Sequence, residues 1–389
     1  MFKISGLNSI AQIGLDLFSD QYQYEQTDDL SNSAAALVRS AALHDIALPD
    51  TLQAIARAGA GVNNIPLDTC AEQGVVVFNT PGANANGVKE AVIAGLLLSS
   101  RDIVEGINWV STVKDEPTVD KLIEKKKANF AGIEIKGKKI GVIGLGAVGV
   151  LVANAAKNLE MEVYGYDPFI SVDAAWRLSK HVRHCRSIEE IYRDCDFITV
   201  HVPLSKDTKG MFNQATFNKM KDDVILLNFS RDALFNDDDV IAALASGKVK
   251  RYVTDFPNAQ TAGAQGVIAI PHLGASTAES EDTCAIMAVE QIVDFLENGN
   301  IKNSVNYPDC NLGRCDTAGR IAINYRNIPN MLSQFTTIFS KNNINISNML
   351  NKSRDIWAYT LIDIDSPLTD DIIQALRGIP DVVKVRAIK

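Results

Sequence analysis

The stretch KKIGVIGLGAVG, residues 138–149, decides the fold class of this chain. An apolar run leads into the pattern G-x-G-x-x-G, which is typical of a buried parallel strand that turns into a helix. Gly144 permits the sharp turn, Gly146 lets the backbone approach a pyrophosphate, and Gly149 allows the helix to pack closely on the strand. The N-terminus of that helix then faces the anion. We therefore predict a dinucleotide-binding fold rather than a glycine turn without a ligand.

The residue that follows the next expected strand indicates which dinucleotide is bound. Residues 159–166 are predicted to form that strand, and Asp167 follows it about 20 residues beyond the glycines. A carboxylate at this place accepts hydrogen bonds from the adenosine ribose and repels a 2′-phosphate. Residues 168–171 include no arginine that would reverse this preference. NAD is therefore predicted over NADP.

The composition is that of an ordinary globular protein. The 389 residues suggest roughly two or three domains, and 46% of them are hydrophobic. No apolar stretch is as long as a membrane span, and the first residues, MFKIS, are not those of a signal peptide, so a cytoplasmic location is expected. The six cysteines form no C-x-x-C pair, which argues against a zinc cluster or a disulfide framework. The net charge of −9 argues against a nucleic-acid partner.

Expected strands and helices alternate on both sides of the glycine motif. After it, strands are predicted over residues 197–200, 224–227 and 252–254, which indicates a doubly wound parallel sheet. Before it, strands are predicted over 34–39 and 74–79, a helix over 88–101, and either a helix or an edge strand over 51–58. The glycine motif therefore lies in the middle of the chain.

A further unit is predicted at the C-terminal end. Polar residues rich in Asn, Asp and Gly between positions 300 and 319 are typical of a linker. Residues 320–389 then follow the order strand, helix, strand, strand, helix, strand. This βαββαβ order predicts a ferredoxin-like module.

Several further motifs give the chain a family resemblance. They are RAGAGVNNI at 57–65, NTPGAN at 79–84, HVPL at 201–204, Arg231, Asp255 and PHLGAST at 271–277. With the glycine motif, they make the chain similar to the D-2-hydroxyacid dehydrogenase family, in its phosphoglycerate-oxidising branch with a C-terminal ACT domain. The resemblance implies a discontinuous flavodoxin-like substrate domain over 1–97 and 275–306, a Rossmann domain that binds NAD over 98–274, a linker over 307–319 and an ACT domain over 320–389.

The resemblance also implies a reaction. It is the NAD-dependent oxidation of 3-phospho-D-glycerate to 3-phosphohydroxypyruvate, the first step of the phosphorylated route to L-serine. Such chemistry takes a hydride from C2 while a base removes the hydroxyl proton, and a cation holds the carboxylate and polarises the carbonyl. Arg231 matches the cation. Two alternatives stay open: a dehydrogenase for another D-2-hydroxy acid, and a non-catalytic protein that senses NAD(H).

The acid or base is the least settled part of this interpretation. His272 matches the histidine of the family, and its ordinary pKa suits proton exchange. The family supplies a glutamate shortly after the position of Asp255, whereas residues 256–271 include no acidic residue. Lys89 is the alternative, because a lysine close to Arg231 and a cationic nicotinamide would have a lowered pKa. We predict that Lys89, His272 or both transfer the proton.

The remaining substrate contacts follow from the resemblance. Arg39 and Arg57 match arginines that contact the substrate phosphate, and the guanidinium group suits this dianion. The backbone amides of Gly61 and Val62 are expected to hold the substrate carboxylate. Lys127 lies where relatives bring a cation from the neighbouring subunit, although its run of lysines is also typical of a solvated surface.

Further cofactor contacts are expected around the glycine motif. Asp255 resembles the residue that binds the nicotinamide carboxamide, and Pro203 and Phe229 line the cofactor cleft. Ala147 and Val148 open the helix after the glycines. Many relatives have Arg or Lys at the position of Ala147, so one pyrophosphate contact is expected to be lost.

The C-terminal module suggests regulation. In serine-sensitive relatives, ACT domains pair edge to edge and bind L-serine across the interface. Asn327 and Asn345 match two of those ligands, whereas Tyr325 and Asn330 replace the usual His and Gly. The module therefore either binds serine or only holds subunits together, and a homodimer or homotetramer is expected.

Overall fold

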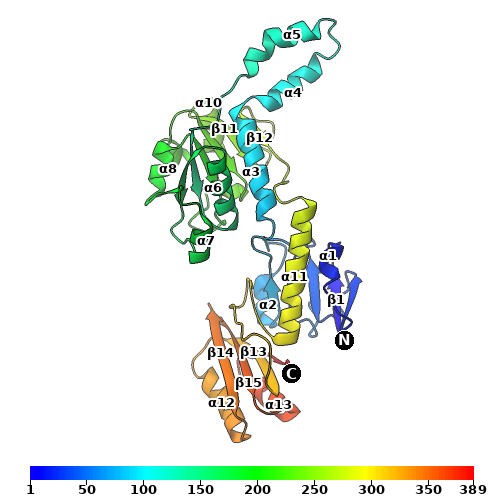
Figure 1. Ribbon diagram of the computed structural model, residues 1–389. Helices are drawn as coiled ribbons and strands as arrows, with labels where there is room; N and C mark the ends of the chain where they lie inside the picture. Colours follow the sequence, from blue (N-terminus) through cyan, green and yellow to red (C-terminus); the bar gives the residue numbers. More distant parts are fainter. The chain divides into compact units, whose positions relative to one another are not determined.

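The computed structural model describes all 389 residues, and they form two compact units (Figure 1). One unit combines Met1–Asn84 with Ala278–Lys389, and the other is Ala85–Thr277. The family resemblance predicts domain boundaries at 97/98 and 274/275. The central unit instead begins at Ala85, so it also includes the helix that precedes the nucleotide-binding sequence. Each unit is described separately below.

The central unit is built on a seven-stranded parallel sheet with the strand order β12-β11-β10-β9-β6-β7-β8. Its strands are β6 (Lys139–Ile143), β7 (Glu162–Tyr166), β8 (Arg183–His184), β9 (Phe197–Val200), β10 (Val224–Asn228), β11 (Val249–Thr254) and β12 (Val267–Ala269). Strand β6 pairs with both β7 and β9, so the order of strands reverses at β6. This arrangement confirms the predicted doubly wound sheet and places a ligand-binding switch point beside β6.

The helices of the central unit cover this sheet. They are α3 (Ala85–Ser100), α6 (Ala147–Asn158), α7 (Val172–Arg177), α8 (Ile188–Asp194), α9 (Gln214–Phe217) and α10 (Asp237–Ala245), with a 3₁₀ turn η2 (Asp232–Leu234). The strand predicted over 159–166 begins only at Glu162. Glu160 has a φ of +61°, and this left-handed residue ends the turn that follows α6.

A helical hairpin in the same unit was not predicted. It consists of α4 (Ile103–Thr112), α5 (Val119–Lys126) and the 3₁₀ turn η1 (Lys127–Phe130), shown in cyan in Figure 1. None of the residues in these three elements is buried. The rings of Trp109 and Phe130 pack on each other at 5.3 Å and hold the hairpin together. We call this segment, residues 103–130, the arm.

The other unit begins with a five-stranded parallel sheet of order β2-β1-β3-β4-β5. Its strands are β1 (Phe2–Gly6), β2 (Tyr22–Gln26), β3 (Ala35–Val38), β4 (Ala54–Arg57) and β5 (Val76–Phe78), and its helices are α1 (Gln12–Leu15), α2 (Leu67–Glu72) and α11 (Ala278–Asn298). The segment 51–58, left open between helix and edge strand, is an interior strand, because β4 pairs with both β3 and β5. Apolar residues of α11, including Ala288 and Ile292, complete the core of this sheet. The order is that of the predicted flavodoxin-like fold.

The C-terminal part of this unit is an antiparallel sheet of order β14-β15-β13-β16. Its elements are β13 (Gly319–Arg326), α12 (Met331–Lys341), β14 (Ile346–Arg354), β15 (Trp357–Ile364), α13 (Asp370–Arg377) and β16 (Val382–Ala387). This succession confirms the predicted βαββαβ module. Buried residues of the two helices, among them Phe335 and Leu376, pack on one face of the sheet.

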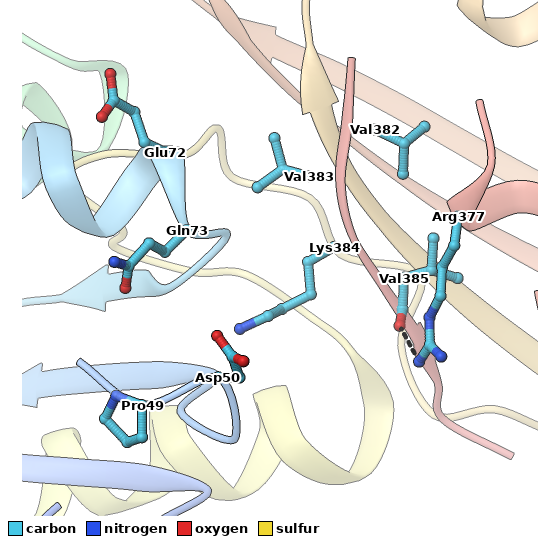
Figure 2. Close-up of a pocket in the computed structure, with 9 residues that line it drawn as sticks. All are labelled: Pro49, Asp50, Glu72, Gln73, Arg377, Val382, Val383, Lys384 and Val385. Carbon is cyan, nitrogen blue, oxygen red and sulfur yellow. Dashed lines mark hydrogen bonds between the residues drawn. The ribbon is translucent and has the colours of Figure 1, made fainter. Parts of the chain in front are cut away.

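Of the predicted linker over residues 307–319, only Gly319 belongs to a regular strand, the first residue of β13, and the segment is packed into the unit. Tyr307 is fully buried and its hydroxyl donates to the carbonyl of Ala71 at 2.7 Å. Nearby, the ammonium group of Lys384 on β16 donates to the carbonyl of Leu52 at 2.6 Å. A pocket of about 480 Å³ surrounds Lys384, and Figure 2 shows that it is lined by the loop before β4 and the end of α2 on one side and by β16 and the end of α13 on the other.

The six cysteines are free and buried. No group of three or more potential metal-ligating side chains occurs. None of the helices combines the length and the apolar character needed to cross a bilayer.

Candidate functional site

The glycine loop after β6 has the geometry that a dinucleotide needs. Gly144 has a φ of +89°, and a Cβ there would lie 2.5 Å from the carbonyl oxygen of His201. A Cβ on Gly149 would lie 1.8 Å from the carbonyl oxygen of Gly144. A Cβ on Gly146 would meet no heavy atom within 4 Å, so its backbone faces open space. Residues Ala147 and Val148 begin α6, whose free amides lie beside this loop.

Asp167 lies beside the same loop, directly after β7. One carboxylate oxygen accepts a hydrogen bond from the amide of Leu145 at 2.8 Å, and the other accepts one from the amide of Phe169 at 2.8 Å. These bonds fix the carboxylate against the glycine turn. A ribose bound at the switch point would meet it there.

Arg231 and Asp255 follow neighbouring strands, β10 and β11. Arg231 is exposed, and its turn is held by the fully buried Asn228, whose amide nitrogen donates to the carbonyl of Arg231 at 2.9 Å. Asp255 is 2% exposed and accepts hydrogen bonds from the amides of Leu273 and Gly274 at 2.8 and 2.9 Å. Burial raises the pKa of the Asp255 carboxyl, although these two bonds oppose the shift. Because the carboxyl ends of parallel strands meet at one edge, Arg231 and Asp255 lie at the same edge as the glycine loop.

The two candidate proton carriers lie on different elements of the central unit. His272 follows β12 with a φ of +52°, and its exposed ring packs on Phe256 with centroids 4.7 Å apart. Lys89 lies in the first turns of α3, and its ammonium nitrogen is 3.3 Å from a carboxylate oxygen of Glu90. His272 therefore shares the sheet edge with Asp255, whereas Lys89 is paired with its neighbour in the chain.

Phe229 and Pro203 differ in exposure. Phe229 is 6% exposed, and its ring lies beside Gly95 of α3, where an added Cβ would approach it to 3.0 Å. Pro203 is exposed, and its carbonyl accepts a hydrogen bond from the hydroxyl of Thr208 at 2.7 Å. Both follow strands that end at the edge with the glycine loop. Pro203 is therefore accessible at this edge, whereas Phe229 is packed beneath it.

In the other unit, the folded chain brings Arg39 and Arg57 together. They lie at the carboxyl ends of neighbouring strands β3 and β4, and the Nε of Arg57 donates to the carbonyl of Arg39 at 3.0 Å. Arg39 also pairs with Glu281 of α11 at 2.5 Å. The backbone amides of Gly61 and Val62, close after β4 in the chain, donate no hydrogen bond within the protein. Two guanidinium groups and two free amides are thus contributed by one end of this sheet.

Lys127 lies on the arm of the central unit, where it pairs with Glu124, and both side chains are exposed. Its position on an exposed projection fits either of the two interpretations offered from the sequence, a surface charge or a contribution to another subunit.

The two expected effector residues are not brought together within one chain. Asn327 follows β13 at the end of the sheet where Trp357 begins β15, and its amide donates to the carbonyl of Asp355 at 3.2 Å. Asn345 precedes β14 at the opposite end, beside Ile364. A site that used both asparagines would therefore need two copies of the module.

The comparisons with known proteins agree with this architecture. Residues 93–274 match the family described as D-isomer specific 2-hydroxyacid dehydrogenase, NAD binding domain. D-3-phosphoglycerate dehydrogenase of Archaeoglobus fulgidus is 35% identical over 264 residues, which cover 66% of this chain and 48% of the relative. The enzyme of the same name from Haemophilus influenzae is 27% identical over 339 residues, which cover 84% of this chain and 79% of the relative. The chain belongs to the D-isomer specific 2-hydroxyacid dehydrogenase family.

Solved structures of this family have the same fold. An NAD⁺-bound 3-phosphoglycerate dehydrogenase of Entamoeba histolytica matches 78% of this chain and 98% of its own, with 25% identity and a TM-score of 0.62. The apo structure of D-lactate dehydrogenase from Escherichia coli matches with a TM-score of 0.62 at 21% identity, which supports the fold alone. The chain spans about half the length of several further curated D-3-phosphoglycerate dehydrogenases.

Membership of the dehydrogenase family confirms NAD as the cofactor predicted from the glycine motif. The open backbone at Gly146 and the carboxylate of Asp167 fit it. Two features of the site were missed from the sequence. One is Asn228, and its place three residues before Arg231 is a signal of a side chain that holds the turn. Asp232 was also missed, because only the fold places it on the same pocket wall as His272.

Proposed function

We propose that this chain catalyses the NAD-dependent oxidation of 3-phospho-D-glycerate to 3-phosphohydroxypyruvate, the first step of the phosphorylated route to L-serine. The observation that carries the substrate assignment is that Arg39 and Arg57 lie at the carboxyl ends of adjacent strands, where the Nε of Arg57 donates to the backbone carbonyl of Arg39. Two arginine side chains from one end of a sheet suit a phosphate dianion, and an unphosphorylated hydroxy acid would not need both. The names of the curated relatives support the same substrate.

The proposed reaction divides the work among the residues already described. Arg231 holds the substrate carboxylate and polarises the oxygen at C2. His272, Lys89 or both remove the hydroxyl proton during oxidation and return it during reduction. Bound NAD supplies the acceptor for the hydride that leaves C2. Gly61 and Val62 offer backbone amides to the substrate.

The direct test is an assay of NADH consumption with 3-phosphohydroxypyruvate and with hydroxypyruvate, which lacks the phosphate. We expect the phosphorylated substrate to be preferred, and Arg57→Gln to lower kcat/KM for it by roughly 10- to 100-fold, the value of one charge-assisted contact. The exposed Arg314→Gln in the same unit is the matched control. Equal use of both substrates would favour a different 2-hydroxy acid. Tight NADH binding without turnover of either would favour the sensor.

The proton carrier is tested by two variants of the same enzyme. If Lys89 is the acceptor, Lys89→Met abolishes turnover and leaves NADH binding intact, whereas His272→Ala has the milder effect. The reverse order assigns the role to His272. NADH binding measured by fluorescence separates a loss of chemistry from a loss of the cofactor.

The arm supports the proposed homo-oligomer. Ile103, Ile107 and Val110 on α4 are 39%, 62% and 42% exposed. At the base of the arm, a groove of about 400 Å³ includes Leu97 and Leu159, which are also exposed. A continuous apolar strip of this kind on a soluble enzyme fold is typical of a surface that pairs with a second copy. Lys127 would then be carried to the neighbouring subunit.

The C-terminal module supports a proposed L-serine site across a pair of such modules. Its edge strand β14 is largely exposed, so a second copy can add to it. Pairing two modules would allow Asn327 of one copy to approach Asn345 of the other. A titration of initial rates with serine tests this role, and unchanged rates at millimolar serine would leave the module a purely structural part.

A further inference from the structure

His272 has little within the chain to hold its ring. The backbone amide donates to the carbonyl of Ile270 at 2.9 Å, and the exposed ring has one aromatic neighbour, Phe256. An imidazole that exchanges protons works best when a carboxylate orients it and stabilises its charged form. The loop after Asp255 supplies no carboxylate, and its Gln260 donates its side-chain amide to Asp238 at 2.9 Å.

The structure offers carboxylates to His272 from elsewhere in the central unit. A pocket of about 400 Å³ is lined by Asp232, Asp255, Phe256, Pro257, Pro271 and His272. Two of the residues that line the pocket, Asp232 and Asp255, therefore carry carboxylates. Both oxygens of Asp255 already accept hydrogen bonds, from the amides of Leu273 and Gly274. His272 also acts electrostatically on Asp255, but both oxygens of that buried carboxylate are held by the backbone, and Asp232 is the exposed acid on the pocket.

Asp232 is held in place by the loop that lacks the glutamate. The side-chain nitrogen of Asn258 lies 3.2 and 3.4 Å from the two oxygens of Asp232. Asn258 is itself fixed, because its oxygen accepts hydrogen bonds from the amides of Gln260 and Thr261 at 3.0 and 3.1 Å. The same nitrogen donates to Asp237 at 2.8 Å. The tether therefore keeps the Asp232 carboxylate at the pocket instead of leaving it free in solvent.

We propose that Asp232 is the positioning carboxylate of His272, in place of the glutamate expected in the loop after Asp255. This inference rests on the proposed dehydrogenase function. In reduction, the cationic ring gives its proton to the C2 oxygen while C2 receives a hydride from NADH, and the ring becomes neutral. In oxidation, the neutral ring takes the hydroxyl proton as the hydride leaves C2. Asp232 stabilises the charged ring in both directions.

The charged groups around His272 set the direction of the expected effect. Asp232 approaches from η2 and Asp255 from the end of β11, while the other pocket residues are uncharged. Arg231 precedes Asp232 in the chain, and Asp237 shares its asparagine tether. Removing the charge of Asp232 leaves the cationic form of His272 with less support. The variant should therefore lose proton transfer first at alkaline pH, where the cationic ring is least populated.

Asp232→Asn is the test, with Asp238→Asn as the matched control, because Asp238 is an exposed acid tethered to the same loop but is absent from the pocket. In the reduction assay, the alkaline limb of the kcat profile should move about one pH unit lower for Asp232→Asn. At pH values above that limb, kcat should fall roughly tenfold, while KM changes less than about twofold. Asp232→Glu should recover most of the rate, and Asp238→Asn should behave as wild type.

A second readout is independent of turnover. The imidazole protons of His272, assigned with His272→Ala among the five histidines, should titrate about one unit lower in Asp232→Asn. An unshifted titration, or a rate that falls equally at every pH, overturns the proposal and leaves Asp232 as a support for Arg231. If the titration of His272 differs between wild type and Asp232→Asn as expected, but wild type turns over no substrate, the dehydrogenase proposal fails. The pairing of Asp232 with His272 then stands.

Discussion

Replacing Lys384 with methionine should change stability in a way that depends on pH. The ammonium group of Lys384 lies in the pocket of Figure 2 and donates to the carbonyl of Leu52. Burial, and then repulsion from Arg386, lower its pKa from 10.5 to about 8, against the attraction of Asp50. The folded protein therefore holds this charge at a cost that the unfolded chain does not have.

The sign follows from counting protons in the two states. Below pH 8 both states keep the proton, and the folded state bears the full cost of the buried charge. Between pH 8 and 10.5 only the unfolded chain keeps it, so the contribution of Lys384 to the free energy of unfolding rises with pH across this window. The full change is about 3 kcal/mol, and the part between pH 7 and 9.5 is about 2 kcal/mol.

The assay is urea unfolding of wild type and Lys384→Met at pH 7 and pH 9.5, followed by tryptophan emission. The exposed Lys352→Met on β14 is the control. Comparing variant with wild type at one pH cancels the contribution of the buried tyrosines and cysteines. Any dependence of the Leu52 hydrogen bond on the charge of Lys384 is already included in the shifted pKa. The free energy of unfolding of Lys384→Met minus that of wild type should be about 2 kcal/mol more positive at pH 7 than at pH 9.5. An equal difference at the two pH values would refute the buried-charge reasoning.

Gly146→Ala should fold normally, because its Cβ meets no atom of the chain within 4 Å, yet weaken NADH binding at least roughly tenfold, as measured by fluorescence titration. Asp363→Asn should cost about 3–5 kcal/mol in urea unfolding, because it leaves the buried Arg320 without its carboxylate partner. The exposed Asp365→Asn should cost less than about 0.5 kcal/mol, and similar losses for the two would contradict the role of the buried pair. Ile107→Asp should lower the mass measured by light scattering, because a charge would enter the apolar strip of the arm; an unchanged mass would place the subunit interface elsewhere.

The parts of the fold that were predictable from sequence carry strong local signals. The glycine motif works at fixed spacing, since Gly144 needs a positive φ and Gly149 has no room for a Cβ. Buried strands such as 197–200 are short apolar runs bounded by polar residues, and the βαββαβ order has few alternatives. The glycine motif and each buried strand are local signals, and the βαββαβ order is a succession of such local signals, so tertiary contacts did not need to be known.

Other elements depended on context that the sequence does not display. Residues 51–58 contain too short an apolar run to separate a strand from a helix, and pairing of β4 on both sides decides the outcome. The arm did carry a signal, because Ile103, Ile107 and Val110 have helical spacing. That pattern normally indicates a face buried within the chain, and here the same face is exposed.

The candidate site shows why a search by motif position can miss a functional group. An imidazole requires a nearby carboxylate, and it does not matter from which part of the chain that carboxylate comes. The loop after β11 includes no acid, but its Asn258 donates to an acid that follows β10. Because β10 and β11 are neighbours in a parallel sheet, their carboxyl ends present side chains to the same space. The fold thus allows a residue that follows β10 to supply the carboxylate, while His272 keeps its place after β12. Asp232 is the residue in that position.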